Sequence, residues 1–257
     1  MLPHRYVFVG GLHRSGTSLV ARLIATLPGV AAITNAPVPE NEGVYLQGAI
    51  PHTALHGRPM HFATDPEQHL VEGCAFDRLE VRTRIEADWA PWFATAPWRV
   101  EKSPPNLTRM RLYQQLFPLA QFVVVIRHPE AVAAATRKWV ERDLPAMVDH
   151  WLDAHERVAG DLPRLHSVLT LRYEDLVADP GRAMAMLAAF LDLEPVPLPE
   201  DVRDGNADYA GAVTLSEGQA ARAARWGYGP GMVVRPRPVE VAHPLWSVAH
   251  AVRMCAG

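Results

Sequence analysis

A short apolar strand that runs into a glycine-bearing loop and then a helix constrains this chain more than any other feature. Tyr6–Val9 has the β-branched and aromatic content of a strand, and apolar residues recur at helical spacing from Ser18 to Leu27. Gly11 and Gly16 lie in this loop, with four residues between the two glycines. This arrangement gathers backbone N–H groups at the start of a helix, where the helix dipole adds positive potential. The loop is therefore predicted to bind the phosphate of a nucleotide.

The loop differs from a Walker A sequence at one decisive position. In a Walker A loop the last glycine is followed by Lys and then by Ser or Thr, which contact the β/γ-phosphates and a magnesium ion. Here Thr17 occupies the lysine position, and the basic residue is Arg14 inside the loop. This difference counts against a nucleoside triphosphate with its metal, so no metal site is expected. A glycine-rich turn without any ligand is the alternative interpretation.

Strands and helices alternate along most of the chain. The run Gln121–Ile126 is the clearest strand, and its apolar character on both faces is typical of the centre of a parallel sheet. Other strands are expected at residues 30–33, 99–101 and 167–173, and other helices at residues 108–117, 131–141, 146–158 and 180–191. The alternation predicts an α/β fold with three layers, in which helices flank a central parallel sheet.

The length and composition fit one globular domain. The chain has 257 residues, of which 49% are hydrophobic and 21% charged, and we expect a single domain over residues 1–257. Scattered prolines and histidines predict helices and long loops at residues 44–98. The segment from about 200 to 257 is expected to be helical and proline-rich, with residues 230–244 wrapping the surface. Cys74 and Cys255 fit no metal-ligand spacing and are expected to be free thiols.

Charge and hydropathy limit the partners. The net charge of −3 argues against a broad nucleic-acid-binding surface, so small-molecule partners are expected. No run of about 18 apolar residues is present, and the start enters a strand-like segment at once, so we expect neither a membrane span nor a signal peptide. These features predict a cytoplasmic protein and leave its oligomeric state open.

Two more basic residues stand at the ends of predicted strands. Lys102 follows residues 99–101, and Arg127 directly follows Ile126. In an open parallel sheet the carboxyl ends of the strands meet at one edge, where ligands bind. The guanidinium fork of an arginine suits a second phosphate, and a compact ammonium suits the charge that develops on a transferred group. Taken singly, each residue could also be a solvated surface charge.

Four segments, in their order along the chain, resemble the sulfotransferases that use 3′-phosphoadenosine 5′-phosphosulfate (PAPS). Residues 12–18 are similar to the 5′-phosphosulfate loop of that family, and residues 101–104 to the Glu-Lys-Ser/Thr-Pro block of its bacterial and carbohydrate- or tyrosyl-protein-type members. Residues 123–135 resemble its 3′-phosphate motif, and residues 171–180 its Tyr-Glu-Asp-Leu segment. The core motifs thus span residues 6–180. The resemblance implies the P-loop NTPase-like sulfotransferase fold.

The resemblance also implies PAPS as donor, 3′-phosphoadenosine 5′-phosphate (PAP) as product, and no metal. Lys102 would contact the bridging oxygen or the sulfuryl group, and Arg127 the 3′-phosphate. The family has a serine eight residues past this arginine, where the chain has Ala135, so Thr136 is the candidate substitute. Tyr173 is a candidate for the adenine pocket and equally for a structural core tyrosine. The 5′-phosphosulfate would be held by the loop residues His13, Arg14, Ser15, Gly16, Thr17 and Ser18.

The acceptor hydroxyl needs a general base. The branch that this chain resembles uses a glutamate just after the second strand, which indicates Glu42 first and Glu40 second. Both could instead be solvated loop acids. The cytosolic branch of the family uses a histidine, and four histidines follow that could take this role: His52, His56, His61 and His69.

The predicted function is transfer of a sulfuryl group from PAPS to an acceptor hydroxyl on a sugar, a lipid or a small metabolite, with catalysis by Glu42, Glu40, Lys102 and Arg14. A small-molecule kinase of the P-loop class and a non-catalytic interaction protein are the alternatives. The acceptor pocket is expected to form from residues 44–98 and from the segment after about residue 205, with its aromatic residues Trp226, Tyr228 and Trp246.

Overall fold

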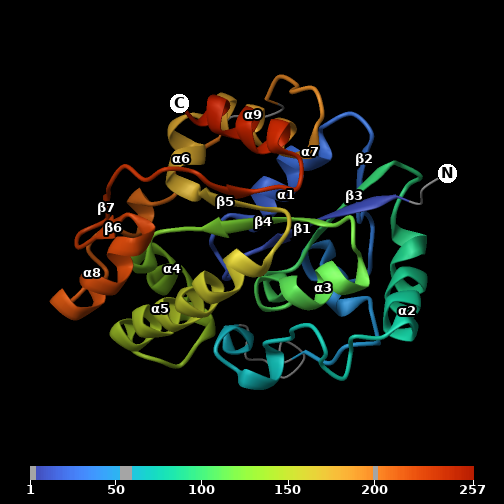
Figure 1. Cartoon of the computed structure of the whole chain (residues 1–257). Helices are drawn as coiled ribbons and strands as arrows, with labels where there is room; N and C mark the ends of the chain where they lie inside the picture. Colours follow the sequence, from blue (N-terminus) through green and yellow to red (C-terminus); the bar gives the residue numbers. More distant parts are fainter. Residues whose placement is uncertain (1–3, 53–59, 199–201) are drawn as a thin grey trace.

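The computed structural model describes residues 4–52, 60–198 and 202–257, and a six-stranded sheet forms its centre (Figure 1). The strands stand in the order β2-β3-β1-β4-β5-β8. The first five in this order are parallel, and β8 pairs antiparallel with β5. Their bounds are β1 Arg5–Gly10, β2 Val30–Ala32, β3 Trp98–Lys102, β4 Gln121–Ile126, β5 Val168–Arg172 and β8 Glu240–Ala242.

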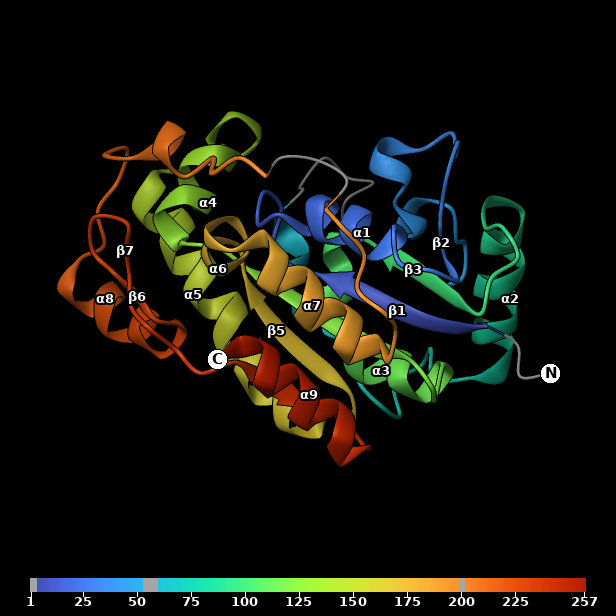
Figure 2. The same ribbon diagram turned by 90° about the horizontal axis from the view of Figure 1, so that it is seen from above.

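Helices cover both faces of the sheet (Figures 1 and 2). One face carries α1 (Thr17–Ala25), α7 (Pro180–Leu191) and α9 (Trp246–Ala256). The other face carries α2 (Leu79–Trp89), α3 (Met110–Leu116), α4 (Pro129–Thr136) and α5 (Leu144–Asp161). The short helix α6 (Tyr173–Ala178) connects β5 to α7, and α8 (Glu217–Ala223) packs against α5 beside the hairpin β6 (Tyr228–Gly229) and β7 (Val233–Val234). The predicted three-layer α/β fold is confirmed.

The central strand β4 shows why helices cover both faces of the sheet. Phe122, Val124 and Ile126 belong to the core cluster on the α3–α5 side, whereas Val123 and Val125 belong to the cluster under α1 and α7. Side chains alternate between the two faces of a strand, so a strand that is apolar at every position needs helices on both sides.

The C-terminal segment differs from the expectation in one respect. Residues 240–242 were expected to lie in a surface-wrapping stretch, and they instead pair with residues 168–170 as the edge strand β8. Pro238 and Pro244 flank this strand and do not interrupt it, which is where an edge strand tolerates proline. The strand covers part of the edge that β5 would otherwise expose.

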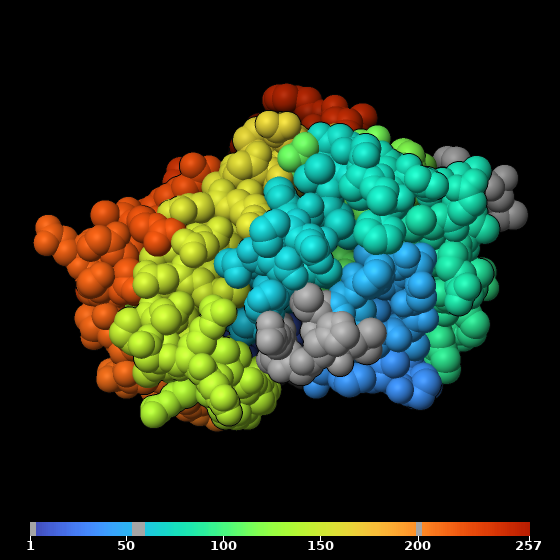
Figure 3. Space-filling model, turned by 90° about the horizontal axis from the view of Figure 1, so that it is seen from below, coloured from blue at the N-terminus to red at the C-terminus, as the bar shows by residue number. Residues whose placement is uncertain are grey.

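The described part of residues 44–98 contains α2, several short 3₁₀ turns and connecting loops, as expected. Figure 3 shows this segment, in blue to teal, beside the yellow-green residues of α5 on the lower face of the molecule. Arg157 of α5 fastens the two together, because its Nη1 donates to the carbonyl oxygens of Ala63 and Asp65, each at 3.2 Å.

Two simpler expectations concern membranes and cysteines. Among the residues that the structure describes, no helix combines the length and the apolar character needed to cross a membrane. Cys74 and Cys255 are free thiols, as expected from their spacing.

The strand order brings the predicted functional segments to one edge of the sheet. β1 lies between β3 and β4, with Val9 paired to Lys102 and Gly10 paired to Val124. The loop after β1, the lysine at the end of β3 and the arginine after β4 therefore leave neighbouring strands on the same side. This edge is where an open parallel sheet binds its ligands.

Candidate active site

The loop between β1 and α1 packs closely against its neighbours. A Cβ atom at Gly11 would lie 2.5 Å from the Val125 carbonyl oxygen, and one at Gly16 would lie 2.8 Å from the Tyr173 ring. Gly16 also has a φ of 98°, a conformation that favours glycine. Within the described residues, no side chain caps the N-terminus of α1. The first turn of α1 therefore presents backbone N–H groups that suit an anion.

The side chains of the loop combine one exposed cation with three hydroxyl groups. Arg14 is exposed, and its Nη2 donates to the Tyr209 hydroxyl at 3.4 Å. Ser15 is fully buried, and its hydroxyl has no hydrogen-bond partner among residues that the structure describes. Thr17 is buried and Ser18 half-buried in the first turn of α1. These groups could bind a phosphate or sulfate oxygen where the helix begins.

His13 contributes an uncharged ring. It lies half-buried near Phe62 and Trp139, with ring centroids 5.9 and 6.4 Å away. Burial and, to a smaller extent, the charge of Lys102 lower the pKa of His13 to about 4. Its buried Nδ1 has no hydrogen-bond partner in the described part of the chain. At neutral pH His13 can therefore offer a ligand a hydrogen bond but no positive charge.

Lys102 and Glu42 form a buried ion pair at the carboxyl end of β3. The Nζ atom of Lys102 lies 2.8 Å from Oε1 of Glu42, and less than a tenth of either side chain is exposed. Burial raises the pKa of Glu42, and the Lys102 charge offsets only part of this shift. The pair places a cation beside a carboxylate that holds a proton more tightly than an ordinary glutamate does.

Glu101 holds this pair in place, a role that the sequence analysis missed. The Oε1 atom of Glu101 accepts hydrogen bonds from the Gly43 backbone at 2.9 Å and from the Ser103 hydroxyl at 2.5 Å, and Oε2 accepts from Asn106 at 2.6 Å. The loop after Glu42 is thereby tied to the end of β3, next to Lys102. An acid at the end of the strand predicted at residues 99–101 is the signal that could have indicated a buried carboxylate.

Arg127 is held at the end of β4 with part of its guanidinium uncommitted. Its Nε donates to the Asn206 side chain at 2.7 Å, and Nη1 donates to the Arg14 carbonyl oxygen at 3.0 Å. Its Nη2 is buried and has no hydrogen-bond partner among the described residues. The guanidinium carbon lies 4.2 Å from the centroid of the Tyr173 ring. A fixed fork with an unused N–H group is suited to an anion.

Residues 203–209 complete this part of the site. The Tyr173 hydroxyl donates to the Arg203 carbonyl oxygen at 3.0 Å and accepts from the Gly205 N–H at 2.9 Å. Asn206 and Tyr209 contact Arg127 and Arg14 as described above. The sequence alone does not connect these residues with the loop, because a turn-forming run such as Asp204-Gly205-Asn206 does not indicate what it packs against.

A model of the sulfotransferase family matches residues 6–197 of this chain. The chain belongs to the sulfotransferase family. The matched range includes the loop after β1, the Lys102–Glu42 pair, Arg127 and Tyr173, so all the predicted catalytic and donor-binding residues fall inside it.

Solved bacterial sulfotransferases are similar to this family member. Sulfotransferase STF9 from Mycobacterium avium has 14% identity and a TM-score of 0.55, over 88% of this chain and 76% of STF9. The sulfotransferase domain of the Synechococcus PCC 7002 olefin synthase has 19% identity and a TM-score of 0.49, over 99% of this chain and 95% of that domain. Sulfotransferase STF1 from Mycobacterium tuberculosis H37Rv has 18% identity and a TM-score of 0.46, over 75% of this chain and 68% of STF1. The likeness to STF9 concerns the fold. No curated protein matches the sequence of the chain.

The hydroxyl group of Thr136 in this sulfotransferase forms a hydrogen bond within its own helix, α4. The side chain is fully buried, and Oγ1 donates to the Val132 carbonyl oxygen at 2.7 Å. Its proton is therefore committed within α4, and Ala135 beside it is also buried. The assignment of Thr136 to the 3′-phosphate stays a prediction, and nothing in its surroundings favours it.

The four histidines that are alternative candidates for the base lie within residues 44–98 of the sequence. His61 lies 3.6 Å from Asp65, and His69 lies 2.7 Å from Asp161 at the end of α5. His52 is buried, with its ring 5.2 Å from that of Tyr45, and His56 lies outside the described residues. His61 and His69 are thus engaged with acids other than Glu42.

The aromatic residues expected in the acceptor pocket differ in exposure. Trp226 and Tyr228 are at most 1% exposed and pack in the core beside α5. Trp246 is 72% exposed on α9, at the surface of the molecule. The expectation that the three residues shape the acceptor pocket stays a prediction, and the burial of Trp226 and Tyr228 does not favour it.

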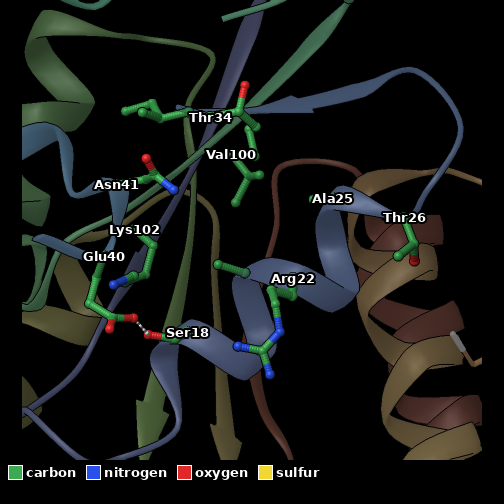
Figure 4. Close-up of a pocket in the computed structure, with 12 residues that line it drawn as sticks. Ser18, Arg22, Ala25, Thr26, Thr34, Glu40, Asn41, Val100 and Lys102 are labelled. Carbon is green, nitrogen blue, oxygen red and sulfur yellow. Dashed lines mark hydrogen bonds between the residues drawn. The ribbon is translucent and has the colours of Figure 1, made fainter. Parts of the chain in front are cut away.

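A pocket of about 710 Å³ opens beside Lys102 (Figure 4). One wall is formed by α1 from Ser18 to Ala25 and by Thr26 directly after it, and the opposite wall by residues 32–34 with Val100. Glu40 lies at the same end as Lys102, and the Ser18 hydroxyl donates to its Oε2 at 3.5 Å. In contrast to the buried Glu42, Glu40 is exposed.

The described residues contain no group of three or more His, Cys, Asp or Glu side chains that could hold a metal ion. Arg14, Lys102 and Arg127 bring positive charge to the site.

Proposed function

We propose that this protein transfers a sulfuryl group from PAPS to an acceptor hydroxyl. The observation that carries the proposal is the buried contact between Lys102 and Glu42 at the same sheet edge as the phosphate-type loop and Arg127. Membership of the sulfotransferase family supports sulfuryl transfer as the reaction. The charge pattern of the site supports the identity of the donor.

The residues present fit a donor with two anionic ends. The loop, through Arg14, the Ser15 hydroxyl and the first turn of α1, would hold the 5′-phosphosulfate. The unused N–H group of Arg127 would hold the 3′-phosphate, beside Tyr173. Two buried polar atoms, Ser15 Oγ and Arg127 Nη2, have no partner in the described part of the chain, and both would gain one from such a donor.

The chain's own groups then account for the transfer. A bond forms between the acceptor oxygen and sulfur while the bond between sulfur and the 5′-phosphate oxygen breaks. Glu42 takes the proton of the acceptor hydroxyl, and the raised pKa of Glu42 suits this task. Lys102 stabilises the negative charge that develops on the departing oxygen. Glu40, which faces the pocket, is the second candidate for the base.

Thr17 at the lysine position argues against the kinase interpretation, since a P-loop kinase uses a lysine there for its phosphates.

We also treat residues 1–257 as one domain, because the segment beyond residue 197 supplies β8 to the sheet and α9 to one of its faces.

A thermal-shift comparison of PAP with ADP plus Mg²⁺ tests the proposal. We expect PAP alone to raise the melting temperature, and labelled PAPS to yield PAP in the presence of a suitable alcohol. Stabilisation by ADP plus Mg²⁺ alone would identify a kinase. Stabilisation by neither nucleotide would identify a protein that kept the fold without the activity.

A further inference from the structure

The pocket between α1 and the strands β2 and β3 shares one end with the proposed transfer site. Lys102 and Glu40 lie at that end, and Figure 4 shows the Glu40 carboxylate beside Ser18, with the Lys102 side chain next to Glu40. The wall extends along α1 from Ser18 and ends at Thr26, the residue after the helix, which corresponds to roughly 12 Å along the helix axis. The pocket is thus an elongated space that begins at the reacting groups.

The residues that line this space are of two kinds. Charged and hydrogen-bonding side chains gather at the Lys102 end, and Arg22, Thr26 and Thr34 add polar groups farther along. Small aliphatic side chains line much of the remainder and leave room for a slender occupant: Ala21, Ala25, Ala32 and Val100. None of the residues described as lining the pocket is aromatic. A phenol or a sugar face would therefore find no ring to stack on.

The pocket lies away from the proposed 3′-phosphate site. Arg127 follows β4, whereas the pocket covers β2 and β3, and β1 with its loop stands between them. Ser18, in the first turn of α1, lines the pocket and also belongs to the loop proposed to hold the 5′-phosphosulfate. An in-line displacement needs the acceptor and the leaving group on opposite sides of the transferred group. A molecule in the pocket would approach Lys102 from the side away from Arg127.

We propose that this pocket binds the acceptor and that the acceptor is an aliphatic alcohol, with its hydroxyl at Lys102 and Glu40 and its chain along the alanines of α1. This inference rests on the proposed function and names the substrate class of the same site. Glu40 is the carboxylate that the acceptor meets first, because it is exposed and lines the pocket, whereas Glu42 stands behind Lys102.

A series of primary alcohols of increasing chain length, with labelled PAPS as donor, tests the substrate class. We expect kcat/KM to rise at least 10-fold from a short alcohol to one long enough to fill the pocket. A phenol and a methyl hexoside should react more slowly than the long alcohol. A preference for the phenol or the hexoside, or the absence of any dependence on chain length, would overturn the proposal.

Two variants that fill the pocket test its location. Ala25→Phe narrows it from α1, and Thr34→Trp narrows it from an exposed position on the opposite wall, where a large side chain can be accommodated. Each should lower kcat/KM for the long alcohol at least 10-fold and leave the thermal shift by PAP unchanged. Ala251→Phe, at a half-buried alanine of α9, is the matched control and should change neither quantity.

The outcomes separate this inference from the proposed function. If both filled variants sulfate the long alcohol at the rate of the unaltered protein, the acceptor binds elsewhere, although PAP binding and sulfuryl transfer stand. If PAP fails to bind the unaltered protein, the proposed function itself is wrong. If both filled variants lose the PAP shift while Ala251→Phe keeps it, the pocket belongs to the donor and the inference is overturned.

Discussion

The ammonium nitrogen of Lys102 lies 2.8 Å from a carboxylate oxygen of Glu42, and both side chains are buried at the end of β3. Burial alone would destabilise either charged side chain, because the charge loses its contact with water. The attraction between the two opposite charges offsets part of this destabilisation. The net effect still raises the pKa of Glu42, since desolvation outweighs the attraction of Lys102. A carboxylate in this condition is a better base than an exposed one, because its affinity for a proton is higher.

Glu42→Gln should abolish turnover and leave donor binding nearly intact. The substitution keeps the size of the side chain and removes the group that accepts the proton. We expect kcat to fall by about 10² to 10⁴, the usual contribution of a positioned base. Steady-state kinetics with labelled PAPS gives kcat, and the thermal shift by PAP reports donor binding.

Glu40→Gln tests the second candidate for the base, which is two residues away and exposed. If Glu40→Gln loses its activity while Glu42→Gln retains it, the base is Glu40. Full activity in both variants would exclude both glutamates and return the role to a histidine.

Glu101→Gln should impair catalysis through the position of Glu42. Glu101 accepts three hydrogen bonds, and an amide in its place would turn an NH₂ group toward donors. We expect a loss of about 1 to 3 kcal/mol in the free energy of unfolding, since buried donors lose their acceptor. The kcat should also fall, while the affinity for PAP is retained.

Urea unfolding, kcat and PAP affinity check this prediction together. Glu80→Gln, at an exposed position of α2, should change none of them. A variant that loses stability with an unchanged kcat would show that Glu101 supports only the fold.

Arg127→Ala should weaken PAP binding far more than binding of adenosine 5′-phosphate. The hydrogen bonds of a guanidinium to a charged partner contribute about 1.5 to 3 kcal/mol, so the Kd for PAP should rise roughly 10- to 150-fold. The nucleotide without a 3′-phosphate lacks that contact. Titration calorimetry with both nucleotides measures the difference, and Arg225→Ala at an exposed arginine is the control. Equal losses for the two nucleotides would contradict the assignment of the 3′-phosphate.

The sequence was sufficient to place the cations of the site. Lys102 and Arg127 each follow a strand whose apolar character is evident from local residues alone, and parallel strands end on one edge. The same reasoning located the loop from Gly11 to Gly16. These features depend on short-range patterns and on a general rule of α/β folds, and the structure places all three on neighbouring strands.

The contacts that finish the site could not be predicted in this way. Arg127 meets Asn206 across 79 residues of sequence, and Gly43 meets Glu101 across 58. Such contacts depend on how loops pack after the sheet has formed, and no periodic pattern encodes them. The edge strand β8 was missed for a related reason, because three residues between prolines are too few to show an alternating pattern.

His155 should make the protein sensitive to acid. Its side chain is fully buried and stacked on Trp151 with centroids 3.8 Å apart, and burial lowers the pKa of His155 to about 4. In the unfolded chain the pKa is near the model-peptide value of about 6.5. The folded state therefore binds the proton less tightly than the unfolded chain. The contribution of neutral His155 to the free energy of unfolding is complete above about pH 6.5 and is lost as the pH falls toward 4.

Proton uptake by one histidine such as His155 lowers the free energy of unfolding by about 1.4 kcal/mol for each pH unit in this window. The loss between pH 6.5 and pH 5 is therefore about 2 kcal/mol. His155→Gln should reduce the slope of unfolding free energy against pH by about one proton, whatever it does to stability at pH 7. Urea unfolding at pH 5, 6 and 7 measures the slope. His250→Gln, at an exposed histidine of α9, should keep the slope of the unaltered protein. If His155→Gln also keeps it, His155 takes up no proton when the protein unfolds in this range.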